Sequence, residues 1–390
     1  MKTAFLLGAG ASKDAGLPLA DDLTGKVLND ESGILQRWDN PPYQPGGLKS
    51  TSQGMAQSIL PFLRWIKVQV ECADTSDNHV ANYEDLAYMA AQIRDHLLGE
   101  YDNPTVHPLI QKALCEVWPL LPGKLQPRCE LKRIAEETAK YITHATCCAV
   151  HGVGCNLDYL RFLIEVPPQC NEGALNIFSL NNDTLVEQFL LMKRKPFIDG
   201  FSPALPAEEG QWEPSLFEES AAAETIRLFK LHGSINWFRW RRPPKSRRDK
   251  FIRTDPENGS GGQKRRTDCR STPEGSPEIL VGVFNKMLHY LSALYLPLHY
   301  HFYRELETTD ALIVYGYSFG DKGINQRIVD WMEGKVNRKM VVVGPHAKER
   351  GKKARPAIGM TWEQWRKSGK LVPCSYKVGY LNWRVVWKAL

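Results

Sequence analysis

Residues 5–18 read FLLGAGASKDAGLP, and the predicted fold can be built outward from this turn. The apolar run from Thr3 to Leu7 predicts a short, buried, parallel strand. Glycines then follow, and without a Cβ they leave room for backbone N–H groups to approach a diphosphate. We expect a helix from Leu19, whose N-terminus would add partial positive charge. The chain therefore opens with a central strand and a predicted phosphate-binding turn.

This turn differs from two better-known patterns. The dinucleotide fingerprint G-x-G-x-x-G requires glycine at position 13, where this chain has Lys13. A basic residue, Lys2, before an apolar run is also typical of a secretory signal. The apolar run is too short for such a signal, however, and the charged Lys13 and Asp14 follow directly. We therefore interpret the turn as part of the folded domain.

The rest of the chain predicts one α/β domain over residues 1–390. Short apolar runs predict strands at 174–180, 226–231, 279–284, 310–315 and 339–343. Helical patterns are expected at 19–28, 287–306 and 322–336, with a large helical insertion over 55–165 and a lid-like loop at 40–54. Short buried strands alternating with helices are typical of a Rossmann-like parallel sheet with helices on both faces.

Positive charge is concentrated in two segments. Residues 241–270 hold eleven Lys and Arg against four Asp and Glu, and residues 335–390 hold fourteen against two. The net charge of the whole chain is only +6, so the remainder is acidic. Few apolar residues lie in 243–277, which we expect to be a flexible basic insertion. A solvated loop and a solvated C-terminal segment explain the charge. The alternative is a face for an acidic protein or nucleic acid.

The cysteines and the hydropathy exclude several classes of protein. Nine cysteines without regular spacing indicate reduced thiols, as in a cytoplasm. No C-x-x-C pair occurs, and the cluster Cys147, Cys148 and Cys155 lacks the spacing of a zinc site, so we expect no metal. No apolar run approaches the roughly 18 residues of a membrane span. We therefore expect a cytoplasmic protein without contact to membranes.

Polar motifs follow four of the predicted strands, at residues 8–12, 181–183, 232 and 316–321. In an open α/β sheet, ligands bind beyond the carboxyl ends of the strands, so these motifs should meet at one edge. Singly, each has a structural explanation as a tight turn, a helix cap or an ordinary loop histidine. Together, at this spacing, they predict a binding cleft.

The same motifs resemble those of sirtuins and their bacterial relatives. GAGAS at 8–12 with GLP at 16–18 is similar to the opening G-A-G-x-S and G-[IL]-P. SLNND at 179–183 and KLHGS at 230–234 are similar to T-Q-N-x-D and x-L-H-G-S. GYSFGD at 316–321 resembles the G-Y-S-F-x-D of the sirtuin-like NAD hydrolases of bacterial antiphage defence. The motifs span residues 4 to about 330, with little similarity between them.

The resemblance implies NAD⁺ as the substrate and a role for each motif. It makes Asn181 and His232 the catalytic pair and places Asp183 by the nicotinamide pocket. An amide can hold water or a ribose hydroxyl without adding charge, and an imidazole can accept a proton near neutral pH. The nucleotide contacts implied are Gly8, Ala9, Gly10 and Ser12 on the diphosphate, and Gly316, Ser318 and Asp321 on the adenosine side.

Two departures from sirtuin deacylases favour hydrolysis. Those enzymes carry a zinc ribbon of two C-x-x-C pairs, which is missing here, and D-F-R after G-[IL]-P, where this chain has LADD at 19–22. The resemblance therefore implies an NAD⁺ glycohydrolase that depletes bacterial NAD⁺ during phage infection. It also implies a homo-oligomer and a HerA-type ATPase as partner. The alternatives are a protein deacylase, an ADP-ribosyltransferase, or a non-catalytic sensor of NAD⁺ or ADP-ribose that drives assembly.

Overall fold

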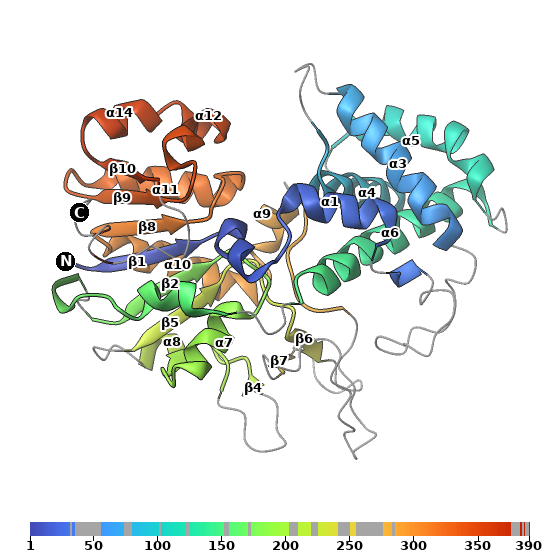
Figure 1. Ribbon diagram of the computed structural model, residues 1–390. Coiled ribbons are helices and arrows are strands. Elements are labelled where there is room, and N and C mark those ends of the chain that lie inside the picture. Colours follow the sequence, from blue (N-terminus) through green and yellow to red (C-terminus); the bar gives the residue numbers. More distant parts are fainter. Residues whose placement is uncertain are drawn as a thin grey trace, which may run out of the picture.

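A computed structural model gives the architecture of the protein (Figure 1). It describes residues 1–31, 33–35, 56–73, 80–100, 103–121, 125–151, 156–170, 173–202, 210–219, 225–240, 250–254, 276–282, 285–375, 383, 386 and 390. The loop expected to act as a lid, at 40–54, lies outside these residues.

A seven-stranded parallel sheet forms the centre of the fold, with the strand order β10-β9-β8-β1-β2-β5-β3. Its members are β1 (Thr3–Leu7), β2 (Leu175–Ser179), β3 (Phe197–Ile198), β5 (Ile226–Lys230), β8 (Ala311–Tyr315), β9 (Lys339–Val343) and β10 (Leu371–Cys374). Strand β1 lies between β2 and β8, and Phe5 is in register with Ile177 on one side and Ile313 on the other. All five residues of β1 are buried, as expected for a central strand covered on both faces.

Helices cover both faces of this sheet (Figure 1). They are α7 (Leu185–Met192), α8 (Leu216–Glu219), α10 (Tyr295–Glu307), α11 (Lys322–Gly334), α12 (Arg350–Lys353), α13 (Pro356–Gly359) and α14 (Trp362–Lys367). Successive residues of a strand point to opposite faces. Leu6 therefore packs in one cluster with side chains of α10 and α11. Phe5 and Leu7 pack in another, with side chains of α7. The Rossmann-like architecture is confirmed.

A helical insertion separates β1 from β2 in the sequence, as expected. Within the expected range of 55–165 it contains α3 (Ala56–Ala73), α4 (Tyr83–Leu98), α5 (Val106–Glu116) and α6 (Pro127–Ala149), and the preceding helix α1 (Ala20–Asn29) packs with them. These helices share a core of their own that includes Leu63, Ile93 and Ile134, all fully buried. Figure 1 shows them gathered beside the end of β1, with α9 (Asn285–His289) between them and the sheet.

One expected strand is wrong. Of the described residues in 279–284, only Ile279 forms a β-bridge, to Gly233, and none belongs to a strand. The segment runs instead from the sheet side to the helical insertion. Leu280 is buried in the core beside the sheet, and Val281 packs against the core of the helices. Leu280 and Val281 thus belong to two different cores.

A second, three-stranded antiparallel sheet has the order β4-β7-β6. Its strands are β4 (Gly210–Gln211), β6 (Trp237–Trp240) and β7 (Lys250–Arg253). Strand β7 falls within 243–277, which the composition predicts to be a flexible insertion. At β7 the structure differs, because Phe251 and Ile252 are buried and pair in register with β6. Residues 243–249 and 255–275 lie outside the described residues.

Candidate active site

The turn after β1 packs directly on the turn after β8. The N–H of Gly8 donates to the carbonyl of Tyr315 at 3.0 Å, and the N–H of Gly10 donates to that of Gly316 at 2.8 Å. A Cβ on Gly8 would lie 2.6 Å from Cα of Tyr317, and one on Gly10 would lie 2.9 Å from Cα of Gly316. Both contacts are too close for any side chain, so the glycines are required by the packing of two backbones.

This finding changes the physical reason for the glycines. The sequence predicts that their amides are open to a diphosphate. In the structure, the N–H groups of Gly8 and Gly10 donate to the carbonyls at the end of β8 and of the residue after it. Those of Ala11 and Ser12 donate to carbonyls of their own turn. Ala9 is exposed at the tip. The glycines therefore set the position of the turn, and the hydroxyl of Ser12 and the carbonyl of Gly8 contact the next motif.

Ser12 joins the first motif to the second. Its Oγ donates to Oδ2 of Asp183 at 2.6 Å, and Nδ2 of Asn181 donates to the same Oγ at 2.9 Å. Nδ2 of Asn181 also donates to the carbonyl of Gly8 at 3.0 Å. All three side chains are buried. The predicted catalytic amide, the predicted nicotinamide-side carboxylate and the predicted diphosphate serine thus form one hydrogen-bonded group.

Within this group one acceptor has no partner among the described residues. Oδ1 of Asn181 is buried and makes no hydrogen bond, although Nδ2 of the same side chain makes two. Burying a polar atom without a partner is costly, so such an atom usually marks a place where a ligand or water binds. The arrangement holds the amide in one orientation and leaves its oxygen available.

A buried ion pair contacts the backbone of Asp183. Nζ of Lys230, the last residue of β5, lies 2.8 Å from Oε1 of Glu187 on α7 and also donates to the backbone carbonyl of Asp183. Both side chains are nearly inaccessible to solvent. Burial raises the pKa of Glu187, and the adjacent Lys230 opposes this rise. The spacing of the motifs gives no signal for this pair, because its members lie on different elements.

His232 follows β5 by two residues and is buried. The next residue, Gly233, has φ +79, and a Cβ there would lie 2.0 Å from the carbonyl oxygen of Glu278, so only glycine fits. The carbonyl of His232 accepts from the N–H of Leu280 at 2.9 Å. The same loop bonds to the second motif, since the N–H of Ile235 donates to the carbonyl of Asn182 at 2.9 Å.

The fourth motif brings Asp321 to His232. Oδ2 of Asp321 lies 3.2 Å from Nε2 of His232, close enough for an ion pair, although Nε2 is not aligned for a hydrogen bond. Gly316 has φ +70, where a Cβ would lie 2.1 Å from the nitrogen of Ala11. Ser318 is exposed. The adenosine-side role that the resemblance gives these three residues stays a prediction.

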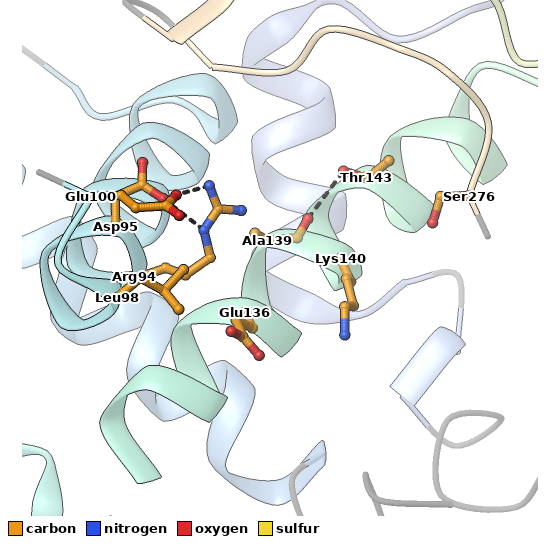
Figure 2. Close-up of a pocket in the computed structure, with 9 residues that line it drawn as sticks. All are labelled: Arg94, Asp95, Leu98, Glu100, Glu136, Ala139, Lys140, Thr143 and Ser276. Atoms are coloured by element: carbon orange, nitrogen blue, oxygen red, sulfur yellow. Dashed lines mark hydrogen bonds and ion pairs between the residues drawn. The ribbon is translucent and has the colours of Figure 1, made fainter. Parts of the chain in front are cut away.

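A cavity of about 510 Å³ lies away from these motifs, between α4 and α6 (Figure 2). Charges of both signs line it, and Arg94 is already held by Oδ1 of Asp95 at 2.6 Å. None of the predicted site residues lines this cavity. The chemistry of the four motifs, rather than this hollow, therefore defines the candidate site.

Among the described residues, no group of three or more His, Cys, Asp or Glu side chains is arranged to hold a metal ion. Cys147 is buried, and burial raises the pKa of its thiol. None of the helices that the structure describes is long and apolar enough to cross a bilayer.

Comparison with known proteins bears on the site once its geometry is known. Residues 175–367 match a family model described as "SIR2-like domain". The match shows that residues 175–367 are similar to SIR2-like domains. It runs from the first residue of β2 into α14 and contains Asn181, Asp183, His232 and Asp321, whereas the turn at 8–12 precedes it.

Solved structures of Sir2 homologues are also similar to the chain, at low sequence identity. One is a Sir2 homologue in complex with NAD, with 13% identity, a TM-score of 0.35, and coverage of 94% of this chain and 89% of the other. Another is a mutant Sir2 homologue in complex with ADP-ribose, with 11% identity, a TM-score of 0.35, and coverage of 94% and 91%. A third is Sir2Tm bound to a propionylated peptide, with 11% identity, a TM-score of 0.30, and coverage of 94% and 93%. No curated protein matches the chain.

Proposed function

We propose that the protein is an NAD⁺ glycohydrolase, which converts NAD⁺ and water to ADP-ribose, nicotinamide and a proton. The observation that carries the proposal is the buried, unpaired Oδ1 of Asn181, whose amide Nδ2 is fixed by Ser12 and Gly8. An oxygen held in this way can accept from a ribose hydroxyl or from the attacking water. The SIR2-like domain match and the order of the four motifs support the same substrate.

Each residue of the site has a defined task in this reaction. The bond between C1′ of the ribose and the nicotinamide nitrogen breaks, and its electron pair leaves with neutral nicotinamide. A water oxygen bonds to C1′ while His232 accepts the proton that this water loses. Asn181 orients the water or the ribose. In this proposal Asp183 contacts the nicotinamide, and the hydrogen bond from Ser12 fixes its carboxylate. Holding the reactants in place supplies much of the rate enhancement.

Hydrolysis is favoured over the transfer of an acyl group from a protein lysine to ADP-ribose. A sirtuin deacylase uses a zinc ribbon beside its acyl-lysine cleft, and this chain contains no C-x-x-C pair. The residues at 19–22 also lack the arginine and the aromatic residue that deacylases place near the nicotinamide ribose.

The proposal is tested by incubating the purified full-length protein with NAD⁺, both alone and together with the purified partner ATPase, and following nicotinamide and ADP-ribose by chromatography. Equal amounts of the two products, formed without an acylated peptide, are expected. Adding such a peptide separates the alternatives, because a deacylase would form O-acyl-ADP-ribose and leave free ADP-ribose at background. That second result would overturn the proposal.

The resemblance to the defence enzymes extends the proposal to the cell. Such an enzyme must stay inactive until infection, so we propose a homo-oligomer whose activity is released by a HerA-type ATPase partner. Bacteria that express both proteins should lose NAD⁺ after phage infection, whereas bacteria with His232→Ala should keep it. Unchanged NAD⁺ in infected wild-type cells would contradict this role and leave the hydrolase activity to the assay above.

A further inference from the structure

The contact between Asp321 and His232 spans the candidate site. His232 follows β5 and Asp321 follows β8, and two strands, β1 and β2, lie between β5 and β8 in the sheet. The contact of 3.2 Å between Oδ2 of Asp321 and Nε2 of His232 therefore joins the loops after β8 and β5 across the ends of β1 and β2. Both side chains are buried, at 7% and 8% exposure.

The carboxylate of Asp321 is fixed from several sides. Its Oδ1 accepts from the N–H of Ile324 at 3.0 Å and so caps α11. The hydroxyl of Tyr290 lies 3.0 Å from Oδ2 and 3.2 Å from Oδ1, and it acts as a donor because burial keeps the pKa of Tyr290 far above its usual range. Burial opposes ionisation of Asp321, but His232, Lys286 and the cap hold the pKa of its carboxyl below the usual range.

The loop that carries Asp321 is itself locked. Phe319 has the left-handed φ of +60, which is strained for a residue with a side chain. Nδ2 of Asn325 donates to the carbonyl of Phe319 at 2.7 Å, and Oδ1 of Asn325 accepts from Tyr317 at 2.9 Å. Nε of Arg355 donates to the carbonyl of Gly320 at 2.6 Å. These bonds keep Asp321 from following a movement of the imidazole.

Other charged groups around the pair do not replace the carboxylate. His299 stacks on Tyr290 with ring centres 3.6 Å apart, and burial, with a smaller effect of His232, lowers its pKa to about 3, so it is neutral. Lys286 on α9 is held by Glu84 of the helical insertion at 2.5 Å. Asp321 is therefore the anion in contact with His232.

We propose that Asp321 is a positioning residue for His232 rather than a nucleotide ligand. The inference rests on the proposed hydrolase function. An ionised carboxylate beside Nε2 stabilises the tautomer with its proton on that nitrogen and leaves the lone pair of Nδ1 to accept the proton of water.

The first test is Asp321→Asn, which preserves size and cap. The cap uses the remaining oxygen of Asn, so its NH₂ faces Nε2 and favours the opposite tautomer. We expect kcat to fall by roughly tenfold or more, with KM nearly unchanged. Asp330→Asn, an exposed residue of the same helix, is the matched control and should change neither quantity.

A nucleotide-binding role for Asp321 predicts a different result. In that case Asp321→Asn would raise KM and the dissociation constant of ADP-ribose, with kcat unchanged. That outcome would overturn the proposal. The thermal midpoints of Asp321→Asn and Asp330→Asn should equal that of the wild type. Asn at position 321 caps the helix as Asp does, and residue 330 is exposed.

A second readout does not depend on turnover. In protein labelled with ¹⁵N-histidine, with His232 assigned through His232→Gln, the ring nitrogen shifts distinguish the two tautomers. We expect the Nε2–H form in wild type and the Nδ1–H form in Asp321→Asn. The same tautomer in both proteins would reject the positioning role even if NAD⁺ is cleaved. The expected exchange of tautomers in a protein that cleaves no NAD⁺ would refute only the proposed function.

Discussion

Nδ2 of Asn181 donates to Oγ of Ser12 at 2.9 Å, and that hydroxyl donates in turn to Asp183. A side chain of the turn after β1 thereby fixes two side chains of the loop after β2. Because β1 and β2 are neighbours in register, residues separated by more than 160 positions in the chain meet directly. The hydroxyl satisfies one end of the Asn181 amide, and the other end stays available to a ligand.

We predict that Asn181→Ala and His232→Ala each reduce NAD⁺ cleavage by about 100-fold or more, the usual scale for the loss of a general base or an orienting group. Both residues lie after strands, so the fold should be retained, which circular dichroism can check. His107→Ala, an exposed histidine on α5, is the control. Near-normal turnover in both variants would refute the assignment.

Replacement of glycine by alanine should change the free energy of unfolding in opposite directions at two positions. Gly8→Ala forces a Cβ to within 2.6 Å of Cα of Tyr317 and should lower the free energy of unfolding by about 1–3 kcal/mol. Gly25 lies inside α1 with open space around it, so Gly25→Ala should raise that free energy by about 0.5–1 kcal/mol. Urea unfolding measures both. A neutral Gly8→Ala would show that the two turns are not in close contact.

Removal of metal should have no effect. The described residues contain no group suited to hold a metal ion, and the cysteines lack the spacing of a zinc site. We therefore expect the thermal midpoint and the NAD⁺ turnover to be the same before and after dialysis against a chelator. A stoichiometric zinc signal by atomic absorption, or turnover lost with the chelator and restored by zinc, would contradict this.

Stability at acid pH should depend on Glu305. Burial alone would raise its pKa, but Arg227, Lys2 and Arg304 outweigh burial and lower it from 4.5 to about 2. The folded pKa is below the unfolded value, so this stabilisation is present above pH 4.5 and is lost as the pH falls towards 2. Glu305→Gln should therefore flatten the decline of unfolding free energy over this range.

The control for this experiment is Glu363→Gln, an exposed residue on α14. It should leave the acid dependence unchanged, because surface ion pairs contribute little. An equally steep decline in Glu305→Gln would show that other carboxylates cause it.

The sequence by itself determined five strands of the seven-stranded sheet, but not β3 or β10, and it determined the positions of the motifs. Apolar runs predict β1, β2, β5, β8 and β9 because a parallel strand covered on both faces needs no polar residue. The same rule gave a wrong strand at 279–284, where the neighbouring Leu280 and Val281 belong to two different cores. Apolar character shows that a residue is buried, and it does not show which core buries it.

Only the tertiary structure decided how the motifs are coupled. Gly8 and Gly10 are needed because the first turn packs against the backbone at the end of β8. No local sequence pattern shows that their N–H groups donate to carbonyls there. The Lys230–Glu187 pair and the contact of His232 with Asp321 join different elements. Periodicity describes neighbours along the chain, whereas these contacts depend on the order of strands in the sheet. That order is set by packing of the whole core.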